Sequence, residues 1–183
     1  MTDEQFIEMK DDYVDNMKSI LLRAGNIQPT ITILGDHRKD NKPAVIHIPL
    51  PEKIANSDQG KQLFVDEMIP ELSKKMKERF DIKAVAFASE AWMRTAEKDE
   101  FDPEVDDYKK LPIKKEILII TIDDGKETFC NIFEIKRDGK SVTPEGDLID
   151  IIELDKLPEL ETSYGGSEGR FGRLYNKFTK KYF

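Results

Sequence analysis

Apolar residues recur every three or four positions in the first 24 residues, which predicts an amphipathic helix. Thr2 and Gln5 have the spacing of a capping box at its start, and Gly25 can end it. Two runs of strand-forming residues follow at 30–34 and 43–48, separated by a polar stretch. This pattern predicts a hairpin with a longer loop after the first helix.

A second helical pattern begins at Ser57 or Asp58, either of which can serve as its N-cap. Pro70 lies inside this pattern and cannot donate a backbone hydrogen bond, so we expect a kink or a break near Met68. Residues 82–93 are then almost continuously apolar. Such a run predicts a central strand whose two faces are both covered.

Three more strand-like runs follow the central one: 114–122, 127–136 and 141–154. Asp124-Gly125 and Asp138-Gly139 lie between them, and Asp-Gly between strands predicts hairpin turns because the turn needs positive φ. The order of elements predicts an α+β fold. We expect a mostly antiparallel sheet of about six strands, with two helices packed on it and a C-terminal amphipathic helix.

The 183 residues fit one domain, which we place at 1–160, followed by a glycine-containing hinge and a basic helix in 161–183. The net charge of −8 disfavours nucleic acid as a partner of the whole chain. The first 30 residues show no signal peptide, and no apolar run is long enough for a membrane span. We therefore expect no membrane association and a cytoplasmic location, or a location inside a particle assembled in a cell.

A single cysteine, Cys130, excludes an intrachain disulfide and favours a reducing compartment. His37 and His47 have no histidine or cysteine at metal-ligand spacing. Seven carboxylates lie between Glu97 and Asp107, a composition that suits Ca²⁺ or Mg²⁺, but the spacing fails the EF-hand pattern. We interpret this segment as a solvated acidic loop and predict no metal, no cofactor and no catalytic residue.

Glu90, Trp92 and Met93 stand at the end of the predicted central strand. A carboxylate in a covered strand must be paired or must have a shifted pKa. Glu90 is therefore either a general base or metal ligand, or a structural group satisfied by a cation such as Arg94 or Lys115. Trp92 and Met93 either line a pocket or complete the core.

The predicted C-terminal helix carries apolar and basic side chains on different faces, and such a helix must bury its apolar face. It packs on its own domain, docks into a groove of a partner, or binds single-stranded nucleic acid. Its candidate docking residues are Arg170, Phe171, Arg173, Leu174, Tyr175, Phe178 and Tyr182.

Residues 89–93, with the sequence Ser-Glu-Ala-Trp-Met, and the later run 111–119 resemble a pattern in uncharacterised small phage and bacterial proteins. In that pattern Glu-Ala-Trp ends one strand, and a proline followed by a basic-Glu step opens the next. The likeness covers residues 28–122, with lysine where arginine is expected, and rests on Glu90, Ala91, Trp92, Pro112, Lys115 and Glu116.

The resemblance implies a phage or mobile-element origin and carries no known activity. It also implies that Glu90, Trp92 and the Lys115-Glu116 step form one local unit, within which we predict a Glu90–Lys115 ion pair. The candidate pocket residues are Glu90, Trp92, Met93, Lys115 and Glu116.

The absence of catalytic motifs favours a non-enzymatic interaction protein: an accessory, virion-associated or host-directed binding domain that binds a protein partner or itself. Two alternatives stay open. One is a small ligand-binding or metal-assisted hydrolytic domain with its site near Glu90 and Trp92. The other is nucleic-acid binding through the basic C-terminal helix.

Overall fold

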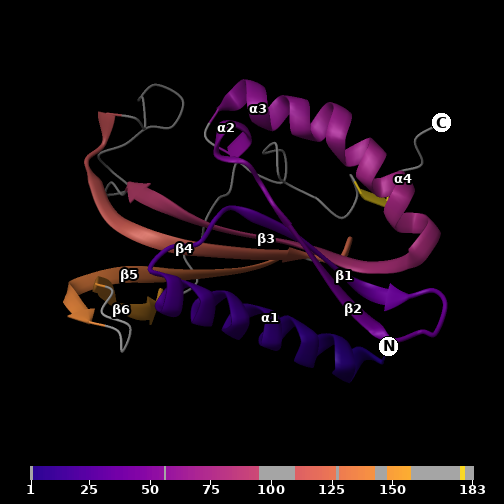
Figure 1. The fold of residues 1–183 in the computed structure, drawn as a ribbon, viewed down its shortest axis with the longest axis horizontal. Coiled ribbons are helices and arrows are strands. Elements are labelled where there is room, and N and C mark those ends of the chain that lie inside the picture. The colour runs from indigo at the N-terminus through magenta and orange to yellow at the C-terminus, as the bar shows by residue number, and fades with distance from the viewer. Residues whose placement is uncertain are drawn as a thin grey trace.

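A computed structural model of the chain describes residues 2–55, 57–94, 110–126, 128–142, 148–157 and 178–179. Its centre is a six-stranded antiparallel sheet in the order β2-β1-β3-β4-β5-β6 (Figure 1). The strands are β1 (Thr30–His37), β2 (Pro43–Pro49), β3 (Phe80–Arg94), β4 (Ile113–Asp123), β5 (Thr128–Val142) and β6 (Leu148–Lys156). Helices lie on both faces of this sheet, so the predicted α+β class is confirmed.

The first helix, α1 (Asp3–Ala24), begins and ends as the sequence predicts. The Thr2 side chain accepts from the backbone N–H of Gln5, and the Gln5 side chain accepts from the N–H of Thr2. Gly25 ends the helix with φ of 75° and donates its N–H to the carbonyl of Leu21. These contacts satisfy backbone groups that helix ends otherwise leave unpaired.

The apolar side of α1 packs on one face of the sheet and forms the first core (Figure 1). Three small residues of β3 let the helix approach closely, namely Ala84, Ala86 and Ala88, none of which is exposed. Larger side chains surround them: Tyr13, Met17, Leu21, Ile27, Leu34, Leu118, Ile120, Ile122, Phe133 and Ile135.

The other face is covered by a chain of short helical segments: α2 (Glu52–Ala55), α3 (Asp58–Leu63), the π-helical segment η1 (Phe64–Met68) and α4 (Ile69–Arg79). The predicted N-cap is confirmed, because Ser57 Oγ accepts from the N–H of Gly60 at 2.9 Å. The predicted break is also found. The π-helical segment ends at Met68, two residues before Pro70, which cannot continue the regular hydrogen-bond pattern.

The second core lies between these helices and the sheet, and Phe64, Ile69 and Phe178 are fully buried in it. Phe178 and Thr179 are the described part of the predicted C-terminal helix. Ser73 Oγ donates to the carbonyl of Phe178, and Lys77 Nζ donates to the carbonyl of Thr179 at 2.7 Å. Thus α4 holds a segment that follows it by about a hundred residues.

The strand β3 is central and has both faces covered, as predicted, because its side chains enter both cores. The Asp124-Gly125 turn is also found between β4 and β5, with φ of 86° at Gly125. The prediction of a turn at Asp138-Gly139 is wrong. There β5 continues to Val142, and Gly139, with φ of 80°, lies where the register with β6 shifts between Arg137 and Lys140. A β-bulge uses a glycine with positive φ as readily as a turn does.

No helix of the described ranges is long and apolar enough to cross a bilayer. The acidic loop at 97–107 and the hinge and most of the helix predicted in 161–183 lie outside the described residues. The division into a domain at 1–160 and a tail therefore stays a prediction.

Candidate functional site

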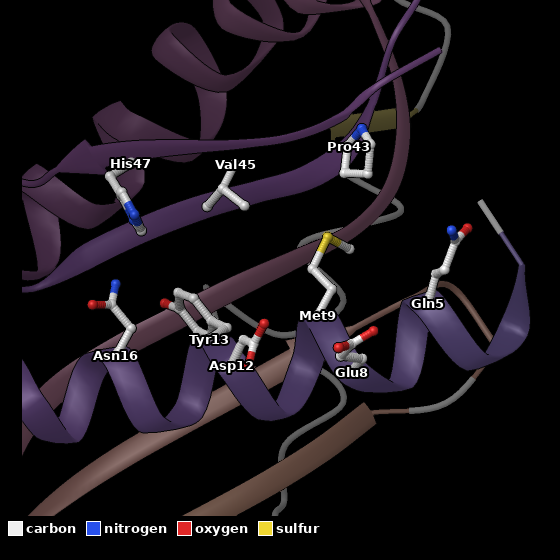
Figure 2. Close-up of a pocket in the computed structure, with 9 residues that line it drawn as sticks. All are labelled: Gln5, Glu8, Met9, Asp12, Tyr13, Asn16, Pro43, Val45 and His47. Carbon is white, nitrogen blue, oxygen red and sulfur yellow. The ribbon is translucent and has the colours of Figure 1, made fainter.

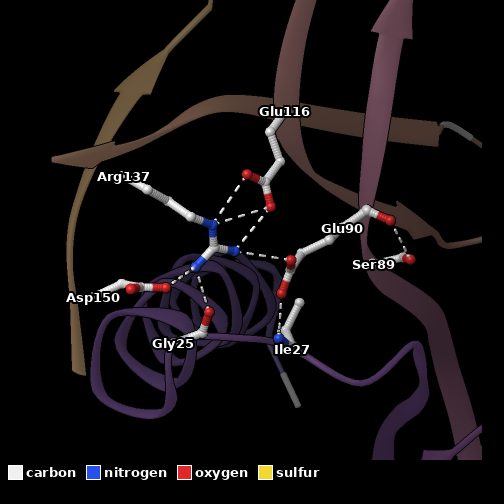
Figure 3. Close-up of polar contacts among 7 residues, drawn as sticks. All are labelled: Gly25, Ile27, Ser89, Glu90, Glu116, Arg137 and Asp150. Carbon is white, nitrogen blue, oxygen red and sulfur yellow. Dashed lines mark hydrogen bonds and ion pairs between the residues drawn. The ribbon is translucent and has the colours of Figure 1, made fainter. Parts of the chain in front are cut away.

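Glu90 lies near the end of β3, on the sheet face that α1 covers, just beyond the end of that helix (Figure 3). One carboxylate oxygen accepts from the backbone N–H of Ile27 at 2.5 Å. The other pairs with Nη2 of Arg137 at 3.1 Å. The carboxylate that the sequence singles out is therefore fully engaged, and its cation comes from β5.

Arg137 is the centre of this site, and its guanidinium contacts four groups besides its own strand. Nη2 and Nε bind the carboxylate of Glu116 at 2.8 and 3.0 Å. Nη1 donates to the carbonyl of Gly25 at 2.6 Å and lies 3.4 Å from the carboxylate of Asp150. We call Glu90, Glu116, Arg137 and Asp150 the Arg137 cluster.

The strand registers explain why these side chains meet. Glu90 is opposite Leu118 and Trp92 is opposite Glu116, so Glu90 and Glu116 point to the same face of the sheet. The bulge after Arg137 shifts the next pairing of β5 to Lys140 with Asp150. This shift keeps Asp150 within reach of the guanidinium at the end of α1.

Burial and the contacts with Arg137 shift the pKa values of the two glutamates in opposite directions. Burial raises the pKa of Glu90 above its ordinary value of 4.5, although the Ile27 N–H and Arg137 act against that rise. The hydrogen bond from Arg137 lowers the pKa of Glu116, and Glu116 in turn raises the pKa of Arg137. Glu116 is therefore the carboxylate that Arg137 holds most firmly in its ionised form.

This geometry suits a structural role better than a chemical one. The side chains of Glu90, Glu116 and Arg137 are only 22%, 17% and 26% exposed, and each carboxylate is already paired with the guanidinium. Arg137 also satisfies a carbonyl at the negative end of the α1 dipole. The cluster thus ties the end of α1 to β3, β4, β5 and β6.

Within the described ranges no group of His, Cys, Asp and Glu side chains is arranged to hold a metal ion. In the Arg137 cluster the guanidinium occupies the position between the carboxylates that a cation would need (Figure 3). The acidic segment at 97–107 lies outside the described residues.

The predicted Glu90–Lys115 ion pair is wrong. Lys115 is opposite Met93 and therefore points to the other face of the sheet, where its Nζ binds Glu134 at 2.6 Å. Arg94, the other predicted partner, donates to the carbonyl of Leu111 instead. The reason is the two-residue period of a strand, which separates Lys115 from Glu116 onto opposite faces.

Trp92 is 63% exposed, so the alternative in which it completes the core is wrong. The pairing of β1 with β3 reaches Ala88. Within the described residues, Trp92 thus lies on a part of β3 that pairs with β4 alone, next to Glu116. Met93 points to the opposite face and is half-buried. The five predicted pocket residues are neighbours in two strands, but they do not converge on one cavity.

Sequence reasoning missed Arg137 and Asp150. The one local signal was the Asp138-Gly139 step, which marks a distortion of the strand beside Arg137. Of the seven predicted docking residues, Phe178 alone is described, and it is buried in the second core. The docking role of that segment stays a prediction.

The chain matches no family model, no curated protein and no solved structure. The resemblance to phage and bacterial proteins therefore also stays a prediction, and the described geometry alone guides the functional proposal.

Proposed function

We propose that this chain is a non-enzymatic protein-interaction domain. The observation that carries the proposal is the contrast between two neighbouring residues of β3. Glu90, the best candidate for chemistry, is engaged by Arg137 and by the Ile27 backbone, whereas Trp92 is 63% exposed beside it. A large exposed aromatic residue next to an internally paired charged cluster suits recognition of a partner better than catalysis.

The position of Trp92 supports this role. It stands on a two-stranded extension of β3 and β4, anchored at its base by the Arg137 cluster. Tryptophan is enriched among the residues that contribute most to binding, because it buries a large area at a small cost in side-chain entropy. We include in the proposal a phage or mobile-element origin and a location in host cytoplasm or virion, which rest on the resemblance alone.

The alternative of a ligand-binding or hydrolytic site near Glu90 required this carboxylate to face an open pocket. It is paired instead, so the described geometry does not support that alternative. Nucleic-acid binding through the basic helix rests on residues outside the described ranges, and we do not propose it.

Trp92 is the only tryptophan, so its own fluorescence reports on its surroundings. We would measure the solution mass by light scattering, and the tryptophan emission, over a wide range of protein concentration. Self-association through this surface predicts a rising mass with a blue shift of the emission, and Trp92→Ala should abolish the rise in mass. Ile151→Ala is the matched control, because Ile151 is another large exposed apolar residue, at 44%, on β6.

If the wild-type chain stays monomeric, immobilised full-length chain is used to capture proteins from a cell extract. The proposal expects a captured protein that is lost with Trp92→Ala and kept with Ile151→Ala. A monomer whose captured proteins are the same for both variants contradicts a binding role for this surface.

A further inference from the structure

A groove of about 510 Å³ lies between the first half of α1 and the edge strand β2, away from the Arg137 cluster (Figure 2). Glu8, Met9, Asp12 and Tyr13 line it from α1, and Val45 and His47 line it from β2. Two carboxylates and no lysine or arginine face the groove among its lining residues. Its charge therefore favours a basic occupant.

Tyr13 gives the groove a polar floor. Its side chain points from α1 toward β2 and stacks with the His47 ring, at 6.3 Å between centroids and 20° between planes. Tyr13 is only 4% exposed, and its hydroxyl makes no hydrogen bond of acceptable geometry to the described residues. Burial raises the pKa of Tyr13 to about 12, while the nearby Thr32 hydroxyl, which also contacts Nδ1 of His47, lowers it in part.

A buried hydroxyl without a partner is unfavourable, and a group that supplies the missing hydrogen bond is stabilised there. Because the phenol stays protonated at neutral pH, it can accept from an ammonium or guanidinium group. The stacked His47 ring covers this oxygen, so we expect an occupant to reach it only if the ring turns aside. Tyr13 is thus an indication of a ligand that is independent of the two carboxylates.

The backbone of β2 supplies a second recognition element. In the antiparallel pairing with β1, the N–H of His37 donates to Lys42 and the N–H of Leu50 donates to Pro29. Hydrogen-bonded and non-hydrogen-bonded residue pairs alternate along an antiparallel pair of strands, and these two bonds show which pairs are bonded. The even-numbered residues of β2 therefore direct their backbone N–H and C=O groups to β1. Val45 and His47 consequently direct their N–H and C=O groups outward, at the edge of the described sheet.

The same two residues place their side chains in the groove, as Figure 2 shows for Val45 and His47. A strand added beside β2 would bond to their backbone groups and could place a side chain over the acidic wall of α1. Strand addition of this kind is a common mode of peptide recognition, in which the backbone gives affinity and a side-chain pocket gives specificity.

We propose that the groove binds an extended segment of a partner protein, added as a strand along β2, with a lysine or arginine side chain reaching Glu8, Asp12 and Tyr13. This site is distinct from the Trp92 surface and does not depend on it.

The probe is the blocked peptide Thr-Val-Thr-Lys-Thr-Val-Thr, titrated into the ¹⁵N-labelled full-length chain while backbone amide signals are followed by NMR. The proposal expects shifts at Val45 and His47, and at least tenfold weaker binding when glutamate replaces the lysine of the peptide. Val45→Pro tests the edge, because it removes an outward N–H without removing a hydrogen bond to β1. Glu8→Gln combined with Asp12→Asn tests the acidic wall.

Both variants should weaken binding at least tenfold, while their other amide signals stay at wild-type positions and show that the fold is intact. Trp92→Ala is included as the control and should bind the peptide as the wild type does, which separates this site from the Trp92 surface. Absence of shifts at Val45 and His47, or binding unchanged by either groove variant, overturns the proposal.

Spermidine is the second probe. If it binds as tightly as the peptide and ignores Val45→Pro, the groove takes small amines and strand addition is wrong.

Discussion

Arg137 connects the C-terminal end of α1 to the later strands of the sheet. It binds two carboxylates that are only about a fifth exposed, together with the carbonyl of Gly25, which immediately follows the helix. We predict that Arg137→Met lowers the free energy of unfolding by about 2 kcal/mol at pH 7, because it leaves Glu90 and Glu116 facing each other unpaired. Urea unfolding followed by circular dichroism measures this change.

The loss of unfolding free energy caused by Arg137→Met should become smaller as the pH falls below about 5. Arg137 lowers the pKa of Glu116, so the stabilisation from that pair is present above the ordinary value of 4.5 and disappears as the pH falls through the lower, folded value. Lys136→Met is the matched control, since Lys136 is the preceding residue and pairs with Asp155 at the surface; it should change stability little. Equal losses for Arg137→Met at pH 7 and at pH 4 contradict this explanation.

The contribution of Glu90 to the free energy of unfolding should change with pH in the opposite direction. Burial raises its pKa in the folded state, so its contribution to stability is full below 4.5 and is lost as the pH rises through the folded value. Glu90→Gln keeps an oxygen for the Ile27 N–H and removes the titration. We therefore predict that the stability of Glu90→Gln relative to wild type rises between pH 4 and pH 7. If the relative stability falls instead, the attraction of Arg137 outweighs the burial of the carboxylate.

Among the elements, those whose residues interact locally were predictable from the sequence. The capping box of Thr2 and Gln5, the turn at Asp124-Gly125 and the interruption before Pro70 each depend on a few neighbouring residues. The Asp138-Gly139 step was assigned to a turn because the local signal is the same for a bulge. Pairing with β6 decided between them, and that is a long-range contact which the sequence pattern does not contain.

A second bulge lies between β1 and β3, and it allows a test of how closely these two strands pack. It occurs at Gly35, where an added Cβ would overlap the carbonyl oxygen of Asp81 in the neighbouring strand. We predict that Gly35→Ala destabilises the protein by about 3 kcal/mol or more, because backbone on one side or the other must move. Gly139→Ala is the control: nothing lies within 4 Å of its added Cβ, and the left-handed φ of 80° alone should cost about 1 kcal/mol. Thermal unfolding of both variants measures the difference, and similar losses would show that the β1–β3 contact is not tight.

At the scale of the whole molecule, the sequence predicted the α+β class, a mostly antiparallel sheet and the central position of β3, because hydrophobic periodicity and short connections indicate them. It could not predict the Arg137 cluster. Arg137 is 47 residues from Glu90 and 112 from Gly25, so no local spacing indicates that they meet. The α1–β2 groove was missed for the same reason, since its two walls come from separate elements.

The second core joins Phe178, near the C-terminal end of the described chain, to residues between Ile31 and Val85, and Phe178 tests its importance. Phe178 is fully buried against the helices that cover the sheet. We predict that Phe178→Ala lowers the free energy of unfolding by about 3 to 5 kcal/mol, the usual cost of removing a buried aromatic ring. Leu22→Ala, at a residue 42% exposed on α1, should change it by less than about 1 kcal/mol. A small loss for Phe178→Ala in urea unfolding would mean that the second core holds without this segment.

The contact between Ser73 and Phe178 also bears on how the protein folds while it is being synthesised. The two residues are 105 positions apart, so α4 is synthesised long before the ring that covers it. During that interval the nascent chain carries an uncovered apolar surface on one side of its growing sheet, the kind of surface that chaperones recognise. We expect a chain arrested before residue 178 to bind ribosome-associated chaperones more strongly than a chain extended at its C-terminus so that residue 178 has left the ribosome.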